Sequence, residues 1–168
     1  MVKRSALAAA CLALVLAAPT QAHESTRRFS DPAGDGQADI VRTSKATIHK
    51  APHHHRTKFA VRLRHAGFWH VDVFVDSRGG PRSDLRLEST RDLGLLECSG
   101  RRRGGGEISL SCGNRRLNDG SEKLWWSIRR SILDPTKRIR WRVVSDTPQD
   151  PVPGVPEVDR APDVGWFK

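Results

Sequence analysis

The sequence lacks the features on which membrane-spanning proteins and most recognisable enzymes depend. Its one long apolar run lies at the N-terminus, and no later segment reaches the roughly 20 apolar residues that a transmembrane helix needs. The sequence also contains no G-x-S-x-G, H-E-x-x-H, P-loop or dinucleotide-binding motif. We therefore expect a non-catalytic protein without a transmembrane span, with an unrecognised hydrolase as the alternative.

The N-terminal apolar run has the layout of a secretory signal peptide. Lys3 and Arg4 precede the apolar residues 6–18, and the segment ends at Ala22 with the small side chain that signal peptidase accepts. We expect residues 1–22 to be cleaved after Ala22, which would leave a secreted, extracellular protein.

Cysteine is scarce. Of the three cysteines, Cys11 falls inside the expected signal peptide, so Cys98 and Cys112 remain. An even pair in an exported protein predicts a disulfide rather than two metal-binding thiols, which would favour a C-x-x-C spacing. The bond would close a loop of about 15 residues and stabilise the fold by about 3 kcal/mol.

Helical periodicity is also missing between residues 39 and 145. Apolar residues alternate with polar ones instead, in runs such as 59–63, 71–75 and 139–143, and glycine, proline, asparagine and aspartate separate the runs. This pattern is typical of short half-buried strands. It predicts an all-β fold, an antiparallel β-sandwich of jelly-roll type over 39–145, with one helical turn at 130–134.

The two flanking segments have other compositions. Residues 23–38 are polar and rich in turn formers, so we expect a polar N-terminal leader. Residues 146–168 hold five of the ten prolines, which excludes a regular helix or a central strand and predicts a Pro-rich C-terminal arm. Because the arm ends in the apolar residues 164–167, we expect it to pack back on the domain.

Three features, in their order along the chain, carry a family resemblance. Asp31-Pro32-Ala33-Gly34-Asp35 is followed by Asp39-Ile40, the valine-rich run 71–76 ends in aspartate, and an aromatic and aliphatic run spans 126–133. Together these features resemble secreted bacterial β-sandwich modules of the carbohydrate-binding and DOMON-like jelly-roll type. The resemblance covers roughly residues 30–145 and implies a sandwich fold with a binding function.

Four aspartates are candidate calcium ligands. Asp31, Asp35 and Asp39 are spaced by four residues in a glycine-containing loop, and Asp76 ends a predicted strand. Calcium takes several oxygen ligands from carboxylates and loop carbonyls. Turns in which aspartate accepts hydrogen bonds from nearby backbone N–H groups are the alternative.

The histidines offer a different metal hypothesis. His53, His54 and His55 follow Pro52, and two of them together with His49, His65 or His70 would suit copper or zinc. A polar hairpin loop without a metal explains the same residues.

Arginine supplies most of the formal net charge of +10. Six arginines fall on the polar phase of predicted strands, and we expect adjacent strands to gather them in one patch: Arg62, Arg64, Arg86, Arg138, Arg140 and Arg142. The runs 101–103 and 115–116 flank the predicted disulfide hairpin. Such a surface binds polyanions with an affinity that depends on salt. A solvated face with interspersed acids is the alternative.

The sequence has five tryptophans and no tyrosine. Trp126 and Trp141 share the apolar phase and are predicted core residues, whereas Trp125 has the opposite phase. Trp125 would either stack on a sugar face or lie beneath the C-terminal arm.

The combined features predict a non-catalytic, monomeric secreted module that binds an extracellular anionic polymer or glycan of the cell surface or wall, with no intracellular nucleic acid as partner. Two alternatives remain open. One is a structural or interaction domain braced by a calcium loop, and the other is a metal-handling protein that uses its histidines.

Overall fold

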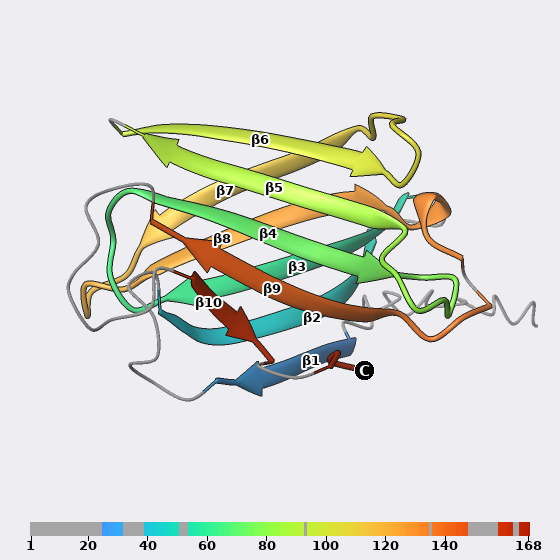
Figure 1. Ribbon diagram of the computed structural model, residues 1–168, viewed down its shortest axis with the longest axis horizontal. Helices are drawn as coiled ribbons and strands as arrows, with labels where there is room; N and C mark the ends of the chain where they lie inside the picture. The colour runs from blue at the N-terminus through green and yellow to red at the C-terminus, as the bar shows by residue number, and fades with distance from the viewer. Residues whose placement is uncertain are drawn as a thin grey trace, which may run out of the picture.

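The computed structural model describes residues 25–31, 39–50, 54–92, 94–134, 136–147, 158–162 and 165–168. Within these residues the chain forms two five-stranded antiparallel sheets that pack face to face (Figure 1). The predicted antiparallel β-sandwich is therefore confirmed. The 3-10 turn η1 (Arg130–Ile132) falls where the sequence predicts a helical turn. No helix among the described residues has the length and apolar character to cross a membrane.

The chain passes between the sheets three times, after β3, β6 and β8. The first sheet has the order β1 (Ser25–Ser30), β2 (Ile40–Lys50), β3 (His54–Leu63), β8 (Glu122–Arg129), β7 (Leu110–Arg116). The second sheet has the order β10 (Val158–Ala161), β9 (Arg140–Asp146), β4 (Trp69–Asp76), β5 (Leu85–Asp92), β6 (Leu95–Arg102). Strand β1 lies within the predicted leader and β10 within the predicted arm, so both flanks extend the sheets beyond 39–145.

The core lies between the two sheets and follows the alternation seen in the sequence. On β4, for example, Val71, Val73 and Val75 are buried while the residues between them face outward and are half-buried. Trp126 and Trp141 are fully buried, as predicted. The remaining strands contribute the other inward residues from both sheets. The alternate residues of each strand, which face outward, can therefore carry charged side chains without burying them in the core.

Three buried indoles connect the sheets by hydrogen bonds. A buried tryptophan needs an acceptor for its N–H, and each of the three finds one on the opposite sheet. The Nε1–H groups donate from Trp69 to Glu122 Oε2 (3.0 Å), from Trp126 to the Glu88 carbonyl oxygen (3.2 Å) and from Trp141 to Thr43 Oγ1 (3.1 Å). The bonds therefore fix the offset of one sheet over the other.

Glu122 is a charged residue in the interior, with no exposed surface. Its carboxylate also accepts hydrogen bonds from Arg91 Nη1 at 2.6 Å and Asn114 Nδ2 at 2.5 Å. A buried carboxylate is tolerated when a counter-charge and hydrogen bonds replace its water. Since Arg91 belongs to β5 and Glu122 to β8, this ion pair also joins the two sheets.

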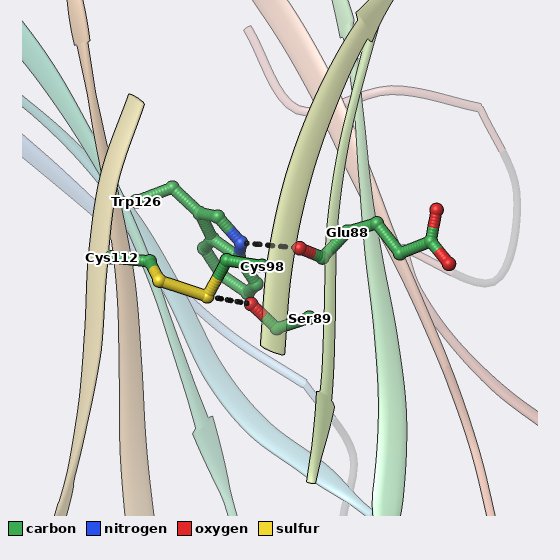
Figure 2. The surroundings of a disulfide bond; sticks show 5 residues. All are labelled: Glu88, Ser89, Cys98, Cys112 and Trp126. Carbon is green, nitrogen blue, oxygen red and sulfur yellow. Dashed lines mark hydrogen bonds between the residues drawn. A yellow bond between two sulfur atoms is a disulfide. The ribbon is translucent and has the colours of Figure 1, made fainter. Parts of the chain in front are cut away.

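A disulfide closes one edge of the sandwich. Cys98 on β6 and Cys112 on β7 are bonded, with an S–S distance of 2.03 Å, which confirms the predicted pair. Figure 2 shows the bond beside Trp126, with the Ser89 hydroxyl 3.1 Å from Cys98 Sγ. Because β6 and β7 are the edge strands of different sheets, the bond is a covalent link between the layers (Figure 1).

The end of the chain closes the other edge. Phe167 exchanges two backbone hydrogen bonds with Trp141, of 2.9 and 3.1 Å, and its ring stacks on Phe29 of β1 at a centroid distance of 4.6 Å. Asp159 on β10 accepts a hydrogen bond from the backbone N–H of Ile40 at 2.5 Å. These contacts join β1 and β2 of the first sheet to β9 and β10 of the second.

Asp76 fastens the end of β4 to the start of β9. Its buried carboxylate accepts hydrogen bonds from Arg140 Nε at 2.8 Å and from the backbone N–H groups of Gly79 at 2.8 Å and Arg78 at 3.1 Å. Burial alone would raise the pKa of Asp76, but the Arg140 guanidinium and these backbone donors hold the pKa below its ordinary value.

We expect the double variant Cys98→Ser, Cys112→Ser to lose about 3 kcal/mol of unfolding free energy, because the unfolded chain regains the entropy of a loop of about 15 residues. Urea unfolding of the oxidised wild type and the variant measures the difference. Wild type treated with a reductant is the matched control and should give the same midpoint as the variant. An unchanged midpoint in both would contradict a stabilising link between the sheets.

We expect Asp76→Asn to lose about 3 kcal/mol of stability at pH 7, because the change leaves the Arg140 charge without its partner. The folded-state pKa of Asp76 is lowered, so the unfolded state takes up the proton first as the pH falls. The contribution is therefore complete above the unfolded pKa of about 3.9 and is lost as the pH falls through the folded value. Unfolding free energies of both proteins between pH 7 and 2 should converge at the acid end. A constant gap would contradict the ion pair.

Candidate functional site

The outer face of the second sheet carries a row of cationic and aromatic side chains. In the antiparallel register Arg142 pairs with Phe74, Phe74 with Arg86, and Arg86 with Arg101. These four residues, which we call the arginine row, cross β9, β4, β5 and β6 side by side. Neighbouring strands lie about 4.8 Å apart, so the row extends over about 14 Å.

Aromatic rings hold the guanidinium groups at one end of this row. The Arg142 guanidinium lies 4.9 Å from the centre of the Phe74 ring and 5.1 Å from that of Trp166, and the Arg86 guanidinium lies 5.9 Å from Phe74. A guanidinium that packs on a ring keeps the N–H donors at its edge for an anion. The rings therefore position both cations and leave the donors of Arg142 available, whereas Arg86 donates to Asp72.

The row leads into a basic pocket at the start of β5. The pocket has a volume of ≈ 320 Å³ and is lined by residues of the arginine row together with Arg82, Arg102 and Arg103. An adjoining pocket of ≈ 460 Å³ shares Arg82, Arg102 and Arg103 and adds Arg78. We call this pair of hollows the arginine pocket.

Backbone hydrogen bonds fix the turn that follows β6 beside this pocket. Arg103 N–H donates to the Asp84 carbonyl at 2.9 Å, and Arg102 N–H donates to the Gly106 carbonyl at 2.6 Å. Gly104 and Gly105 have φ angles of +100° and +101°, a region that side chains with a Cβ rarely adopt. The three consecutive arginines therefore lie at the end of β6 and the start of a defined turn, next to the β4–β5 loop.

The arginines of this face differ in how they are neutralised. Arg86 donates from Nε and Nη2 to the Asp72 carboxylate, each at 2.7 Å, and Arg140 is bound to Asp76. Within the described residues, Arg82, Arg101, Arg102 and Arg103 form no ion pair with a carboxylate. The positive charge of the arginine pocket is thus largely uncompensated.

The six arginines singled out in the sequence do not lie in one patch. Arg86, Arg140 and Arg142 lie on the second sheet, whereas Arg62 lies on the first sheet and is bound to Asp119. Arg64 follows β3 and is bound to Asp39. The split follows from the chain path, since β3 and β4 belong to opposite sheets whose outer faces point away from each other.

Arg138 precedes β9 and lies in a different cationic region. Burial, together with the positive charges of Arg27, Arg138 and Arg130, lowers the pKa of Lys45. Lys45 Nζ lies 5.4 Å from the centre of the Trp141 ring. Arg138 therefore contributes to a second group of positive charges and not to the arginine row.

Trp125 lies on the outer face of the first sheet. It is half-buried, with Lys58 Nζ 4.9 Å from the ring centre, and the ring covers Gly113, where a Cβ would lie 2.3 Å from it. A pocket of ≈ 290 Å³ on this sheet is lined by residues that include Arg28, Arg42, Arg62 and Lys123, but not by Trp125. The structure thus separates the predicted stacking residue from the arginine row.

The predicted calcium ligands are only partly within the described residues. Asp39 is buried and bound to Arg64 at the end of the sandwich where β4 begins, whereas Asp76 lies at the other end of β4. Asp76 is also committed to Arg140, so it does not join the other aspartates. Asp35 lies outside the described residues, and calcium binding by Asp31, Asp35 and Asp39 stays a prediction.

The predicted histidine group is divided as well. The backbone register of β2 and β3 pairs His49 with His55, so these residues are neighbours on the first sheet. His53 lies outside the described residues, His65 is exposed after β3, and His70 belongs to the second sheet. The described histidines of the run therefore lie on the other sheet from His70, and metal binding by the histidine run stays a prediction.

Sequence reasoning missed Phe74 and Arg101 as members of the site. Phe74 stands on the polar phase of its strand, which is the one signal that would have marked it as a surface aromatic. Arg101 was noted only as a flank of the disulfide hairpin, because its alignment with Arg86 depends on a register that composition does not reveal.

Comparison of the chain with models of protein families, with curated proteins and with solved structures gives no match in any of the three. The functional argument therefore depends on the geometry of the arginine row and the arginine pocket.

Proposed function

We propose that the protein is a secreted, non-catalytic binding module that holds an anionic polymer of the cell surface or cell wall on the outer face of its second sheet. The observation that carries this proposal is the register that places Arg142, Phe74, Arg86 and Arg101 in one row across four strands. The row leads directly to the arginine pocket, where Asp84 and Asp76 are among the lining residues but Arg82, Arg102 and Arg103 form no ion pair within the described residues.

The chemistry of this face suits a chain of anions better than a single small one. The row and pocket together present guanidinium groups along a line, so successive phosphate or carboxylate groups of a polymer can each meet a cation. Guanidinium groups bind both anions in a bidentate manner. Phe74, half-buried between two of them, offers an apolar surface for the carbon skeleton of a sugar.

Two observations support an extracellular setting for this activity. The disulfide between Cys98 and Cys112 suits an oxidising compartment. The first 22 residues have the charged, apolar and small-residue regions of a signal peptide. A surface polymer outside the cytoplasm is therefore the class of partner that the protein would meet.

The test measures retention of the oxidised protein on a purified wall teichoic acid across a salt series up to about 1 M, where the Debye length is about 3 Å. We expect retention at low salt and release at high salt, because binding displaces counterions. A neutral glucan is the control polymer and should retain nothing. Retention that is insensitive to salt would overturn the proposal.

The location is tested with two triple variants that remove the same charge. We expect Arg101→Ser, Arg102→Ser, Arg103→Ser to weaken binding by at least about tenfold, because three exposed ionic contacts of about 0.5–1 kcal/mol each are lost. Arg115→Ser, Arg116→Ser, Arg129→Ser is the matched control on exposed positions of the first sheet and should bind nearly as wild type. Equal losses in both variants would show that net charge, and not the arginine pocket, determines binding.

A further inference from the structure

One histidine and three carboxylates gather on the same outer face, beyond the arginine row. His70 and Asp72 are two residues apart on β4 and so point to the same side of the sheet. Glu88 pairs with Asp72 across β4 and β5, and Asp146 pairs with His70 across β4 and β9. Figure 2 shows the Glu88 side chain on the side of its strand opposite the disulfide, which is the outer face. The four side chains therefore converge from three strands.

The distances within this cluster are not those of hydrogen bonds. His70 Nε2 lies 3.4 Å from Glu88 Oε1 and 3.6 Å from Asp72 Oδ1, whereas an N–H···O bond spans about 2.7–3.2 Å. The Nε2 atom is buried and has no hydrogen-bond partner among the described residues. An imidazolium paired with a carboxylate would contract to about 2.7–2.9 Å. A direct hydrogen bond thus does not account for this spacing.

We propose that His70, Asp72 and Glu88 bind a zinc ion through Nε2 and one oxygen of each carboxylate. Zinc bonds of about 2.0–2.2 Å in a tetrahedral arrangement separate neighbouring ligand atoms by about 3.4 Å. The two distances from Nε2 match that separation, and one ligand atom from each of the three residues lies within 4.8 Å of the others. The His70 and Glu88 side chains are about a quarter and a third exposed, which leaves a fourth position open to water.

Asp146 lies on the side of the imidazole where zinc-binding histidines usually have a supporting carboxylate. Its Oδ1 lies 3.9 Å from His70 Nδ1, the ring nitrogen that does not face the other two carboxylates, which is longer than a direct hydrogen bond. A carboxylate on the second nitrogen orients the imidazole and makes the ligating nitrogen more basic. Asp146 is therefore a positioning residue for the metal and not one of its ligands.

The charges of the cluster favour a divalent cation in spite of Arg86. Three carboxylates face one guanidinium, and a divalent ion would neutralise the excess negative charge. Arg86 Nε occupies one lone pair of Asp72 Oδ1, and Arg86 Nη2 bonds the other oxygen. Each carboxylate oxygen has a second lone pair. Asp72 can therefore bind Arg86 and the ion together, and the site does not require the polymer.

Zinc chloride titrated into the oxidised, metal-free protein tests the site by calorimetry, and cobalt substitution reports its geometry by visible absorption. We expect one zinc ion to bind at this site and the cobalt form to show the intense bands of a tetrahedral centre. His70→Asn and Glu88→Gln should each abolish these bands and weaken zinc binding by at least about tenfold, and Asp146→Asn should weaken it by about tenfold. Unfolding curves recorded with a chelator establish that each variant is folded.

His65→Asn and the double variant His54→Asn, His55→Asn are the matched controls, since they remove imidazoles elsewhere. They should leave the cobalt bands unchanged. Bands that survive in both His70→Asn and Glu88→Gln, or that disappear in the His54, His55 variant, would overturn the proposal and assign the metal to the histidine run. Absence of zinc binding to the wild type would overturn it outright.

Discussion

Three indole N–H groups, each bonded to an acceptor on the opposite sheet, set the geometry on which the rest of the sandwich depends. A purely apolar interface would allow the layers to slide, because hydrophobic contact has no direction. The bonds of Trp69, Trp126 and Trp141 are directional, and they are spread from one end of the core to the other. The buried ion pair of Glu122 with Arg91 adds a charged connection at one of them. The offset of the two sheets is thereby fixed, and this offset determines where the outward-facing side chains of each sheet lie.

Sequence alternation was sufficient to predict strands and their inward residues, because these follow from local pattern. The disulfide was predicted separately, from an even cysteine pair that follows an expected signal peptide. The sheet to which each strand belongs could not be predicted in this way. Arg62 and Arg142 have the same phase relative to their neighbours, but β3 and β9 lie in different layers, so the two side chains point in opposite directions. The arginines predicted to form one patch are therefore divided between the outer faces of the two sheets. Phe74 was missed for the same reason, since its place between Arg86 and Arg142 is a matter of register.

The outer face of the second sheet is divided by charge. His70, Glu88 and Asp146 gather on one side, the guanidinium groups gather on the other with Asp76 and Asp84 among them, and the Asp72–Arg86 pair lies at the boundary. This arrangement limits repulsion among the arginines without neutralising those at the pocket. It also means that an anion and a cation can approach neighbouring parts of one surface. The proposed polymer site and the proposed zinc site are therefore adjacent but chemically distinct.

The two edges of the sandwich are closed by different means, one by a disulfide and the other by the final residues of the chain. Figure 1 shows the chain end near β1, at the edge that lacks the covalent link. Partial opening of a protein starts where the fewest strong contacts hold it. We therefore expect the two sheets to separate first at the edge formed by β1 and β10 while they stay joined at the disulfide between β6 and β7. Amide exchange should be fastest in β1 and β10. The arginine pocket includes the end of β6, so it belongs to the edge at which the two sheets stay joined.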